Sequence, residues 1–409
     1  MSRYPSPRHA RPRTSLLGRL HGWLPSGQAS QWFIGVSFID AIGTGLFLAG
    51  APLFFTRELG LTTEQVGVGI SLSGIAGLLG LVPVGRLADR LGGKRTLIAL
   101  NLWRGVGFAV YPFVRGPDAF FVVAFLIGIA EWSVGPVVQA VVAAVEQGQS
   151  RVRTMAALGS VRNIGFTIGA VLATLVVAIG NTGNYVVLVL IDAGTFFITA
   201  GLLSRLSVAT PTGARAGRPV RTGARLHDGR YLALTALNGL LYLHSVVLTV
   251  GLPLWIATRT SAPRAVVAAV VVVNTVIAIV LQVPLSKGSD DARQAARRQQ
   301  WAGWSLAGCC VLVALTAHAN PAVATGLVLA AALALTLGEI WQSVGAWGLS
   351  YAFAPPEQLG YYLSVYNLGL TGATVVGPVL VTFVVIRAGS LGWLGLAAAF
   401  GCTGLAVVL

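Results

Sequence analysis

The sequence predicts an all-α membrane protein whose twelve transmembrane helices form two pseudo-symmetric six-helix bundles. Three observations predict this fold class. Of the 409 residues, 55% are hydrophobic and only 10% are charged, whereas soluble domains carry about 25% charged residues. Apolar runs long enough to cross a bilayer recur along the whole chain. Short motifs of the first half also reappear, in the same order, in the second half.

Each apolar run must be helical, because lipid offers the backbone no hydrogen-bond partner. A helix of about 20 residues crosses the hydrocarbon core of a bilayer. In chain order, the predicted spans are 32–55, 64–84, 96–115, 119–144, 153–179, 184–206, 230–256, 263–286, 300–318, 321–351, 358–387 and 391–409. The mean hydropathy of +0.77 agrees with a chain that lies mostly in lipid.

The basic residues are concentrated in every second loop. Of 28 Lys and Arg residues, 21 lie in the N-terminal tail or in the loops that follow even-numbered spans, and five lie in the opposite loops. This bias is the positive-inside signature, which predicts a multi-pass protein of the inner (plasma) membrane with both termini in the cytoplasm. The net charge of +15 therefore reflects topology, and no nucleic-acid partner is expected.

A polar stretch divides the spans into two sets of six. We predict a cytoplasmic tail (1–31), an N-terminal bundle (32–206), a cytoplasmic central loop (207–229) and a C-terminal bundle (230–409). The matches between the halves include GAPLFF (50–55) and GLPLWI (251–256), SVRNIGFT (160–167) and SVYNLGLT (364–371), Pro83 and Pro284, Asp89 and Asp290, and Glu131 and Glu339. Because six is even, both halves enter the membrane in the same orientation. Parallel repeats of this kind occur in transporters that bind substrate between the halves.

The loop after the second span reads GRLADRLGGKR (85–95). It resembles the loop signature of the major facilitator superfamily at Gly85, Leu87, Ala88, Asp89, Arg90, Gly92, Lys94 and Arg95. With the twelve spans and the repeat, the resemblance covers nearly the whole chain. It implies a secondary transporter that works by alternating access, with this loop as a gate that stabilises one end state. Glycines let helix ends approach closely, and an acid can meet a helix N-terminus.

Two departures count against an antiporter without excluding it. The fifth-span stretch GFTIGAVLAT (165–174) has Ala170 where antiporters of this family carry proline, and Glu131 stands in the fourth span where another antiporter pattern has arginine. The second copy of the gate loop, SKGSDD (286–291), keeps Asp290 and little else of the motif. The sequence therefore does not decide whether this second copy forms a gate.

Charges inside the membrane are the strongest functional signal. Four of the thirteen acids lie within predicted spans: Asp40, Glu131, Asp192 and Glu339. Each costs ~2.5–3.5 kcal/mol on insertion scales unless it is paired, hydrated or protonated. The basic partners within spans are Arg104, Arg162 and His244. We interpret Asp192, Arg104 and His244 as structural, because the third and sixth spans are peripheral in this family and His244 points away from the polar face of its span.

The resemblance implies that spans 1, 4, 7 and 10 surround a central cavity, and three of these carry Asp40, Glu131 and Glu339. We expect these acids to bind a coupling proton, or Na⁺, in the cavity. In the alternative interpretation, Glu131 forms a static ion pair with Arg162 or Arg104. Polar and aromatic residues at helical spacing predict the substrate cavity itself: Asn238, Tyr242, Ser245, Gln342, Ser343 and Trp347, with Trp132 and Trp341 as further aromatic walls.

The preferred function is proton-coupled efflux of a small drug-like or natural-product compound across the lipid bilayer by a monomer. A proton-coupled importer is one alternative, because nothing in the sequence fixes direction. A non-transporting sensor or scaffold with structural ion pairs is another. We expect no enzyme, cofactor or metal, because the sequence shows no phosphate loop, no nucleophile with a base and no cysteines at metal-ligand spacing.

Overall fold

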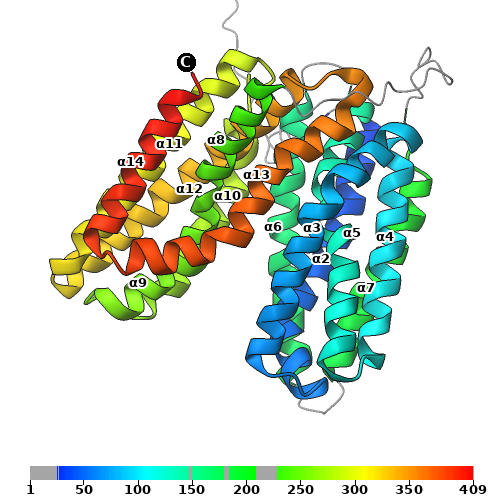
Figure 1. Ribbon diagram of the computed structural model, residues 1–409, viewed down its shortest axis with the longest axis horizontal. Coiled ribbons are helices and arrows are strands. Elements are labelled where there is room, and N and C mark those ends of the chain that lie inside the picture. The colour runs from blue at the N-terminus through cyan, green and yellow to red at the C-terminus, as the bar shows by residue number, and fades with distance from the viewer. Residues whose placement is uncertain (1–24, 26, 147–149, 179–183, 209–227, 409) are drawn as a thin grey trace, which may run out of the picture.

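The structure is a computed structural model, and it describes residues 25, 27–146, 150–178, 184–208 and 228–408. These residues form an all-helical protein (Figure 1). The helices of the first half are α2 (Gln28–Leu53), α3 (Thr63–Leu91), α4 (Gly93–Val110), α5 (Gly116–Val145), α6 (Arg151–Ala178) and α7 (Asn184–Ser204). Those of the second half are α8 (Gly229–Val246), α9 (Leu252–Arg259), α10 (Val266–Leu285), α11 (Ala292–Leu315), α12 (Pro321–Ala352), α13 (Leu359–Leu380) and α14 (Ser390–Ala406).

The twelve predicted spans are present, with α8 and α9 forming the seventh. Among the described residues, ten helices are long and apolar enough to cross a membrane, and the more polar α4 and the shorter α14 complete the set. The largest difference is at α11, which begins eight residues before the predicted span at residue 300. Asp291 caps it by accepting a hydrogen bond from the backbone N–H of Gln294 at 3.0 Å. The polar first turns of α11 therefore extend the helix beyond its apolar run.

Short π-helical segments occur in three spans, where two of them end the span and one lies within it. They are η1 (Phe54–Glu58) after α2, η3 (Val247–Gly251) between α8 and α9, and η6 (Val381–Ile386) after α13. A proline lies within a few residues of each, namely Pro52, Pro253 and Pro378. Proline has no backbone N–H and clashes with the preceding turn, so it disturbs the regular hydrogen-bond ladder.

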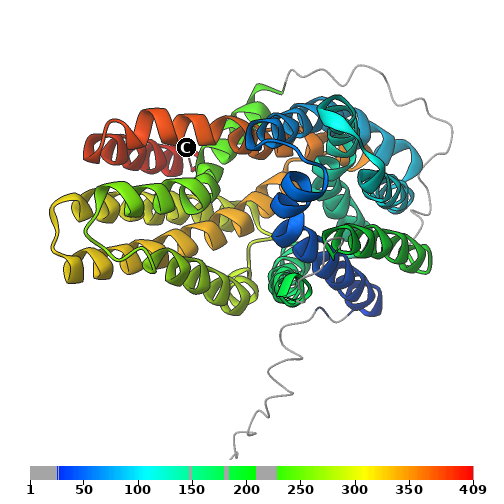
Figure 2. The same cartoon turned by 90° about the horizontal axis from the view of Figure 1, so that it is seen from below.

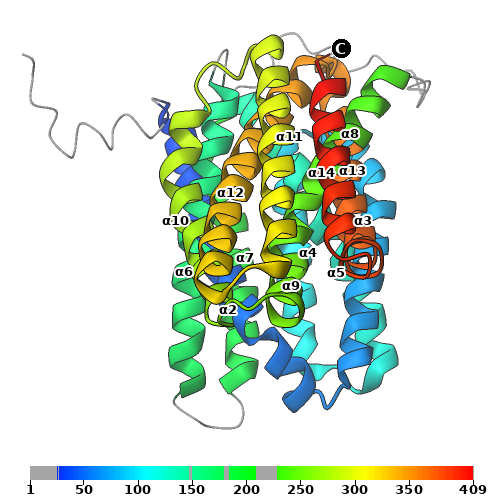
Figure 3. The ribbon, with the colours of Figure 1, turned by 90° about the vertical axis from the view of Figure 1, so that its left-hand side faces the viewer.

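The helices divide into two bundles, α2–α7 and α8–α14. Figures 1 and 2 show them side by side in two perpendicular views, and Figure 3 looks onto the second bundle, where α11 and α14 are neighbours. One large apolar core lies wholly within the second bundle, and a second core lies within the first around Phe54, Phe120 and Phe196. The bundles meet where α13 packs on α3 and α5 and where α10 packs on α6. At the opposite end the ribbons diverge (Figure 1).

Small residues allow the helices of one bundle to lie close together. At the α2–α6 crossing, a Cβ added to Gly169 would lie 2.2 Å from the backbone oxygen of Ile42. Glycine is therefore required at this position. Lipid tails are as apolar as leucine, so membrane helices associate through close packing of this kind rather than through burial of apolar surface. The crossing fixes α2 and α6, which both contribute to the site described next.

Candidate functional site

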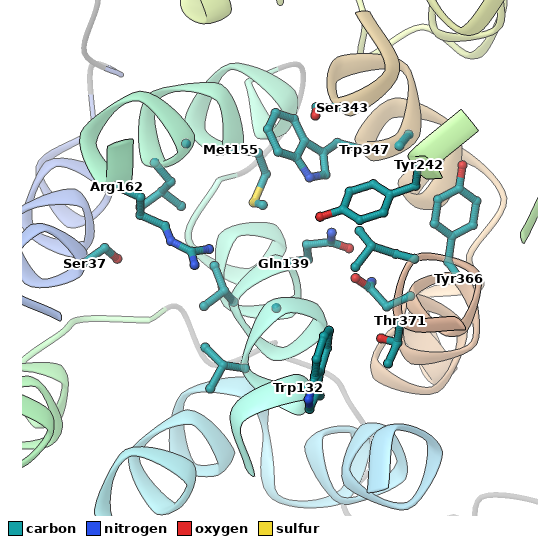
Figure 4. Close-up of a pocket in the computed structure, with 18 of the residues that line it drawn as sticks. Ser37, Trp132, Gln139, Met155, Arg162, Tyr242, Ser343, Trp347, Tyr366 and Thr371 are labelled. Carbon is teal, nitrogen blue, oxygen red and sulfur yellow. The ribbon is translucent and has the colours of Figure 1, made fainter. Parts of the chain in front are cut away.

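A cavity of about 370 Å³ lies between the two bundles. Helices α2, α5 and α6 of the first bundle and α8, α12 and α13 of the second supply nearly all of its lining (Figure 4). Of the predicted site residues, the lining includes Asp40, Arg104, Glu131, Arg162, Asn238, Tyr242, Gln342, Ser343 and Trp347. Glu339 and Ser245 do not line it. Two halves of the sequence thus meet at one polar chamber.

Two of the acids share one arginine. The Nε of Arg104 lies 2.7 Å from Oε2 of Glu131, and its Nη1 lies 3.0 Å from Oδ1 of Asp40. The arginine is only 2% exposed, whereas Asp40 is 20% and Glu131 is 38% exposed. The cation is therefore buried behind its two carboxylates, and the carboxylates face the cavity. Of the two candidate partners for Glu131, the structure selects Arg104.

The surroundings of Arg104 explain why it tolerates burial. Its guanidinium carbon lies 3.8 Å from the ring centroid of Phe196 on α7, and its Nη1 is 3.4 Å from Oδ1 of Asn101. The buried carboxylate of Asp192 also interacts with its charge. Helices α4 and α7, which we expected to be peripheral and structural, thus supply the arginine and part of its setting. Their residues act on the cavity through the ion pairs.

Glu339 is placed differently from the expectation. Its Oε2 accepts a hydrogen bond from Nδ2 of Asn274 at 2.6 Å, on the side of α12 that packs against α10. The same amide donates to Oγ1 of Thr336 at 3.2 Å. Within the described residues Glu339 has no basic partner. The repeat mates Glu131 and Glu339 therefore occupy unlike environments, and Glu339 is not a residue of the cavity wall.

The second bundle contributes amides and aromatic rings. Oδ1 of Asn238 accepts hydrogen bonds from Nε2 of Gln342 at 2.7 Å and from Nε2 of Gln299 at 3.2 Å. Tyr242 and Trp347 line the same cavity as Asn238 and Gln342. Trp132 of α5 lies on another side of the cavity from these two rings (Figure 4). Trp341 does not belong to this wall. It lies in a separate groove beside Trp301 and Trp304 on the outside of the second bundle.

Arg162 stands apart from the ion-pair cluster. Its side chain is exposed and points into the cavity from α6 (Figure 4). Its guanidinium carbon lies 5.4 Å from the centroid of Phe166. No carboxylate of the described chain lies within ion-pair distance of it, and none of the described residues hydrogen-bonds to it. Of the two ion pairs that the alternative interpretation offered for Glu131, the one with Arg162 is therefore absent from the described residues and the one with Arg104 is present.

The motif loop contacts the second bundle. Oδ1 and Oδ2 of Asp89 accept hydrogen bonds from the backbone N–H groups of Gly360 and Tyr361, at 2.6 and 2.9 Å. These donors lie in the first turn of α13, whose N-terminus attracts negative charge. A Cβ on Gly85 would lie 2.5 Å from the carbonyl oxygen of Gly360, so this position requires glycine. We call the Asp89 contact the first latch.

The other motif residues shape the loop within the first bundle. Gly92 has φ +87°, a conformation that favours glycine, and it ends α3 with a hydrogen bond to the carbonyl oxygen of Ala88. Nζ of Lys94 donates to the carbonyl oxygens of Ser204 and Leu206, both at 2.8 Å, near the end of α7. Arg90 and Arg95 are exposed. The motif therefore combines a contact between bundles with a tight turn inside one of them.

The second copy of the loop also reaches across. Oδ1 of Asp290, between α10 and α11, accepts a hydrogen bond from the backbone N–H of Val152 at 3.1 Å, in the first turn of α6. Burial raises the pKa of Asp290 above its ordinary value, although this bond and Arg151 favour the carboxylate. SKGSDD thus retains the one residue needed for a contact between bundles. We call this the second latch.

Both latches lie at the same end of the bundles, where the hydroxyl of Tyr351 also donates to the carbonyl oxygen of Gln139 at 2.8 Å. This end, which we call the closed end, carries the even-numbered loops. The helices diverge at the other end (Figure 1). The bundles therefore contact each other at the closed end and diverge at the other.

A buried carboxylate at the closed end was missed by sequence reasoning. Glu146, just after α5, accepts hydrogen bonds from the hydroxyls of Ser30 and Thr154, at 2.5 and 2.8 Å, and from Ser150. Burial alone would raise the pKa of Glu146, but these hydroxyls and Arg153 outweigh it and lower the pKa below its ordinary value. The carboxylate ties α2 to α5 and α6.

The sign of this shift gives a pH prediction. A lowered pKa contributes stability that is present above the unfolded-state value and is lost as pH falls through the folded-state value. We expect Glu146→Gln to lower the melting temperature in detergent at pH 7, and the gap to wild type to narrow at pH 4. Glu357→Gln, at an exposed glutamate of the same end, is the control. A gap of equal size at both pH values would contradict this assignment.

A match to a family profile agrees with the fold and with the motif at residues 85–95. The profile of the Major Facilitator Superfamily matches residues 33–378. The chain belongs to this superfamily. It is accordingly a multi-pass membrane transporter rather than an enzyme, as the motif resemblance implies. Its helices superpose on an Escherichia coli fucose:proton symporter, FucP, with a TM-score of 0.70 over 92% of this chain and 97% of that one, at 16% identity. That similarity concerns the fold.

Curated relatives within the superfamily are distant. YdeE of Escherichia coli, an uncharacterized transporter of this type, is 25% identical over 83% of this chain and 84% of its own. MdtG of Klebsiella pneumoniae, named a multidrug resistance protein, is 29% identical over 45% of this chain and 44% of its own. A further relative, MJ1560 of Methanocaldococcus jannaschii, is 28% identical, and the alignment spans only 34% of that protein.

Other residues of the site also escaped sequence reasoning. Asn274 is the lone amide in the apolar run VVAAVVVVNTVIAIV (266–280). An isolated amide in such a run indicates a buried hydrogen-bond partner, so the sequence could have predicted this contact. Phe196, which covers Arg104, sits among other apolar residues of α7 and gave no such signal. Gln299 lay outside the predicted span because α11 begins earlier than its apolar run.

Proposed function

We propose that this member of the superfamily exports a small organic compound in exchange for protons, by alternating access. The observation that carries the proposal is the ion-pair cluster, in which Asp40 and Glu131 face the cavity while both depend on the buried Arg104. Two acids on one cation leave the cluster with excess negative charge, and a proton can balance it. Intramembrane acids that face a water-filled cavity are characteristic of proton relays.

The geometry supports a simple coupling cycle. Glu131 is the more exposed of the two acids, so water in the cavity reaches it. A proton that binds there removes one partner of Arg104 and frees the arginine to interact more strongly with Asp40. Substrate and proton occupy the same chamber, so binding of either one changes the binding free energy of the other. When the closed end opens and the diverging end closes, proton and substrate exchange sides.

One observation supports the orientation of the protein in the membrane, and another supports export. The positive-inside bias supports a cytoplasmic location for the closed end, the tail (1–31) and the central loop (207–229), and it does not bear on direction. One relative carries the name of a multidrug resistance protein. We further propose the inner membrane as the location, 32–206 and 230–409 as the two bundles, and H⁺ rather than Na⁺ as the coupling ion.

The test is resistance to toxic compounds in a bacterial host that lacks its own exporters. We expect wild type to raise the inhibitory concentration of some members of a broad panel, and Glu131→Gln to abolish this effect at matched membrane expression. Glu339→Gln is the matched control, because it neutralises the repeat mate outside the cavity. Resistance that survives Glu131→Gln would refute proton coupling through this acid, and protection against no compound would favour uptake.

A further inference from the structure

We propose that the transported compound carries an anionic group, most simply a carboxylate, which binds Arg162 while its apolar body lies against Tyr242 and Trp347. The inference rests on the proposed function and adds a substrate class to it. Its basis is the difference between the two arginines of the cavity. Arg104 is buried and shared by two carboxylates, whereas Arg162 is exposed to the chamber and meets no carboxylate among the described residues.

The same contrast argues against a cationic substrate. A cation entering the cavity must compete with Arg104 for Glu131, whose Oε2 lies 2.7 Å from Nε of that arginine. A cationic group that weakens this pair takes compensation from a buried guanidinium, and unlike a proton it forms no O–H bond with Glu131 in return. An anion at Arg162 breaks no existing pair. It gains a charge-assisted hydrogen bond, and a carboxylate matches the guanidinium in a two-bond geometry.

The repeat explains how the chamber can orient an amphipathic molecule. When SVRNIGFT is aligned with SVYNLGLT, Tyr366 corresponds to Arg162. Tyr366 is buried, and its hydroxyl has no hydrogen-bond partner in the described residues. At the aligned positions the first bundle therefore presents a cation and the second an aromatic ring. The first bundle also contributes Trp132 and two acids that are paired with Arg104, and the second adds Tyr242, Trp347 and amides. Figure 4 shows Arg162 and the rings of Tyr242 and Trp347 on different sides of the chamber. A molecule with an acid at one end and an aromatic body fits this division.

The experiment measures binding to the purified full-length protein without a proton gradient. The probes are aromatic carboxylic acids, each with its primary amide and its aminomethyl analogue, and binding is followed by quenching of tryptophan fluorescence. We expect the acids to bind more tightly than their amides and amines. Arg162→Gln should weaken acid binding by about 10- to 100-fold and leave amide binding unchanged, while Arg162→Lys should retain part of the preference.

Arg264→Gln is the control, because it removes one exposed positive charge outside the cavity. The proposal is overturned if acids bind no better than amides, if amines bind best, if no acid binds, or if Arg162→Gln leaves acid affinity unchanged. These results differ from a failure of the proposed function. That failure would appear as resistance that persists in Glu131→Gln, whatever class of compound binds.

Discussion

Arg104→Gln is expected to lower the stability of the protein by about 3–5 kcal/mol, the usual cost of removing one partner from a buried ion pair. The substitution leaves Asp40 and Glu131 without their shared cation. Asp192, buried nearby, loses the positive charge that interacts with it. We expect little folded protein in the membrane and a much lower melting temperature in detergent, measured by size-exclusion chromatography of heated samples.

A variant in which the two acids are also neutralised distinguishes the contribution of the ion pairs to stability from that of packing. If uncompensated carboxylates cause the loss, Arg104→Gln combined with Asp40→Asn and Glu131→Gln should recover much of the melting temperature. Arg162→Gln is the matched control, because it removes an arginine of the same bundle that has no acidic partner in the described chain. A triple variant no more stable than Arg104→Gln would show that packing on Phe196, and not the ion pairs, is what the arginine contributes.

The sequence predicts the architecture of this protein well because lipid makes the rules simple. Run length identifies a span, loop charge identifies its direction, and the motif at 85–95 identifies the family. The same simplicity limits prediction of the site. Helices that are apolar on most sides carry little information about their rotation, so the sequence, which assigned Glu339 to the cavity with Gln342 and Ser343, did not reveal that Glu339 turns toward α10.

The sequence also could not predict which residues form ion pairs within the membrane. The sequence offered Arg104 and Arg162 as partners for Glu131 without a means to choose between them. The structure shows that the choice depends on where α4 packs against α5 and α7, a property of the assembled bundle. Latch formation by Asp290 depends in the same way on α6 beginning directly opposite it. Both are contacts between residues far apart in the chain, which a single sequence does not encode locally.

Loss of both latches is expected to open the closed end. Asp89 accepts two backbone hydrogen bonds across the bundles and Asp290 accepts one. A hydrogen bond to a charged group is worth about 1.5–3 kcal/mol, so each of these hydrogen bonds changes the ratio of closed to open forms by about 10- to 150-fold. We expect Asp89→Ala combined with Asp290→Ala to populate a form with this end open, and Asp89→Ala alone to have the larger single effect.

The distance between bundles at this end is the direct measurement. Spin labels on cysteines at Leu91 and Arg293, both exposed, report it, with the exposed Cys402 replaced by Ala and the buried Cys309 and Cys310 left in place. The double variant should show a second, longer distance. Arg90→Ala, in the same loop, should match wild type. An unchanged distribution in the double variant would mean that helix packing alone, at contacts such as Gly85 on Gly360, holds the end closed. The latches would then set rates of opening rather than populations.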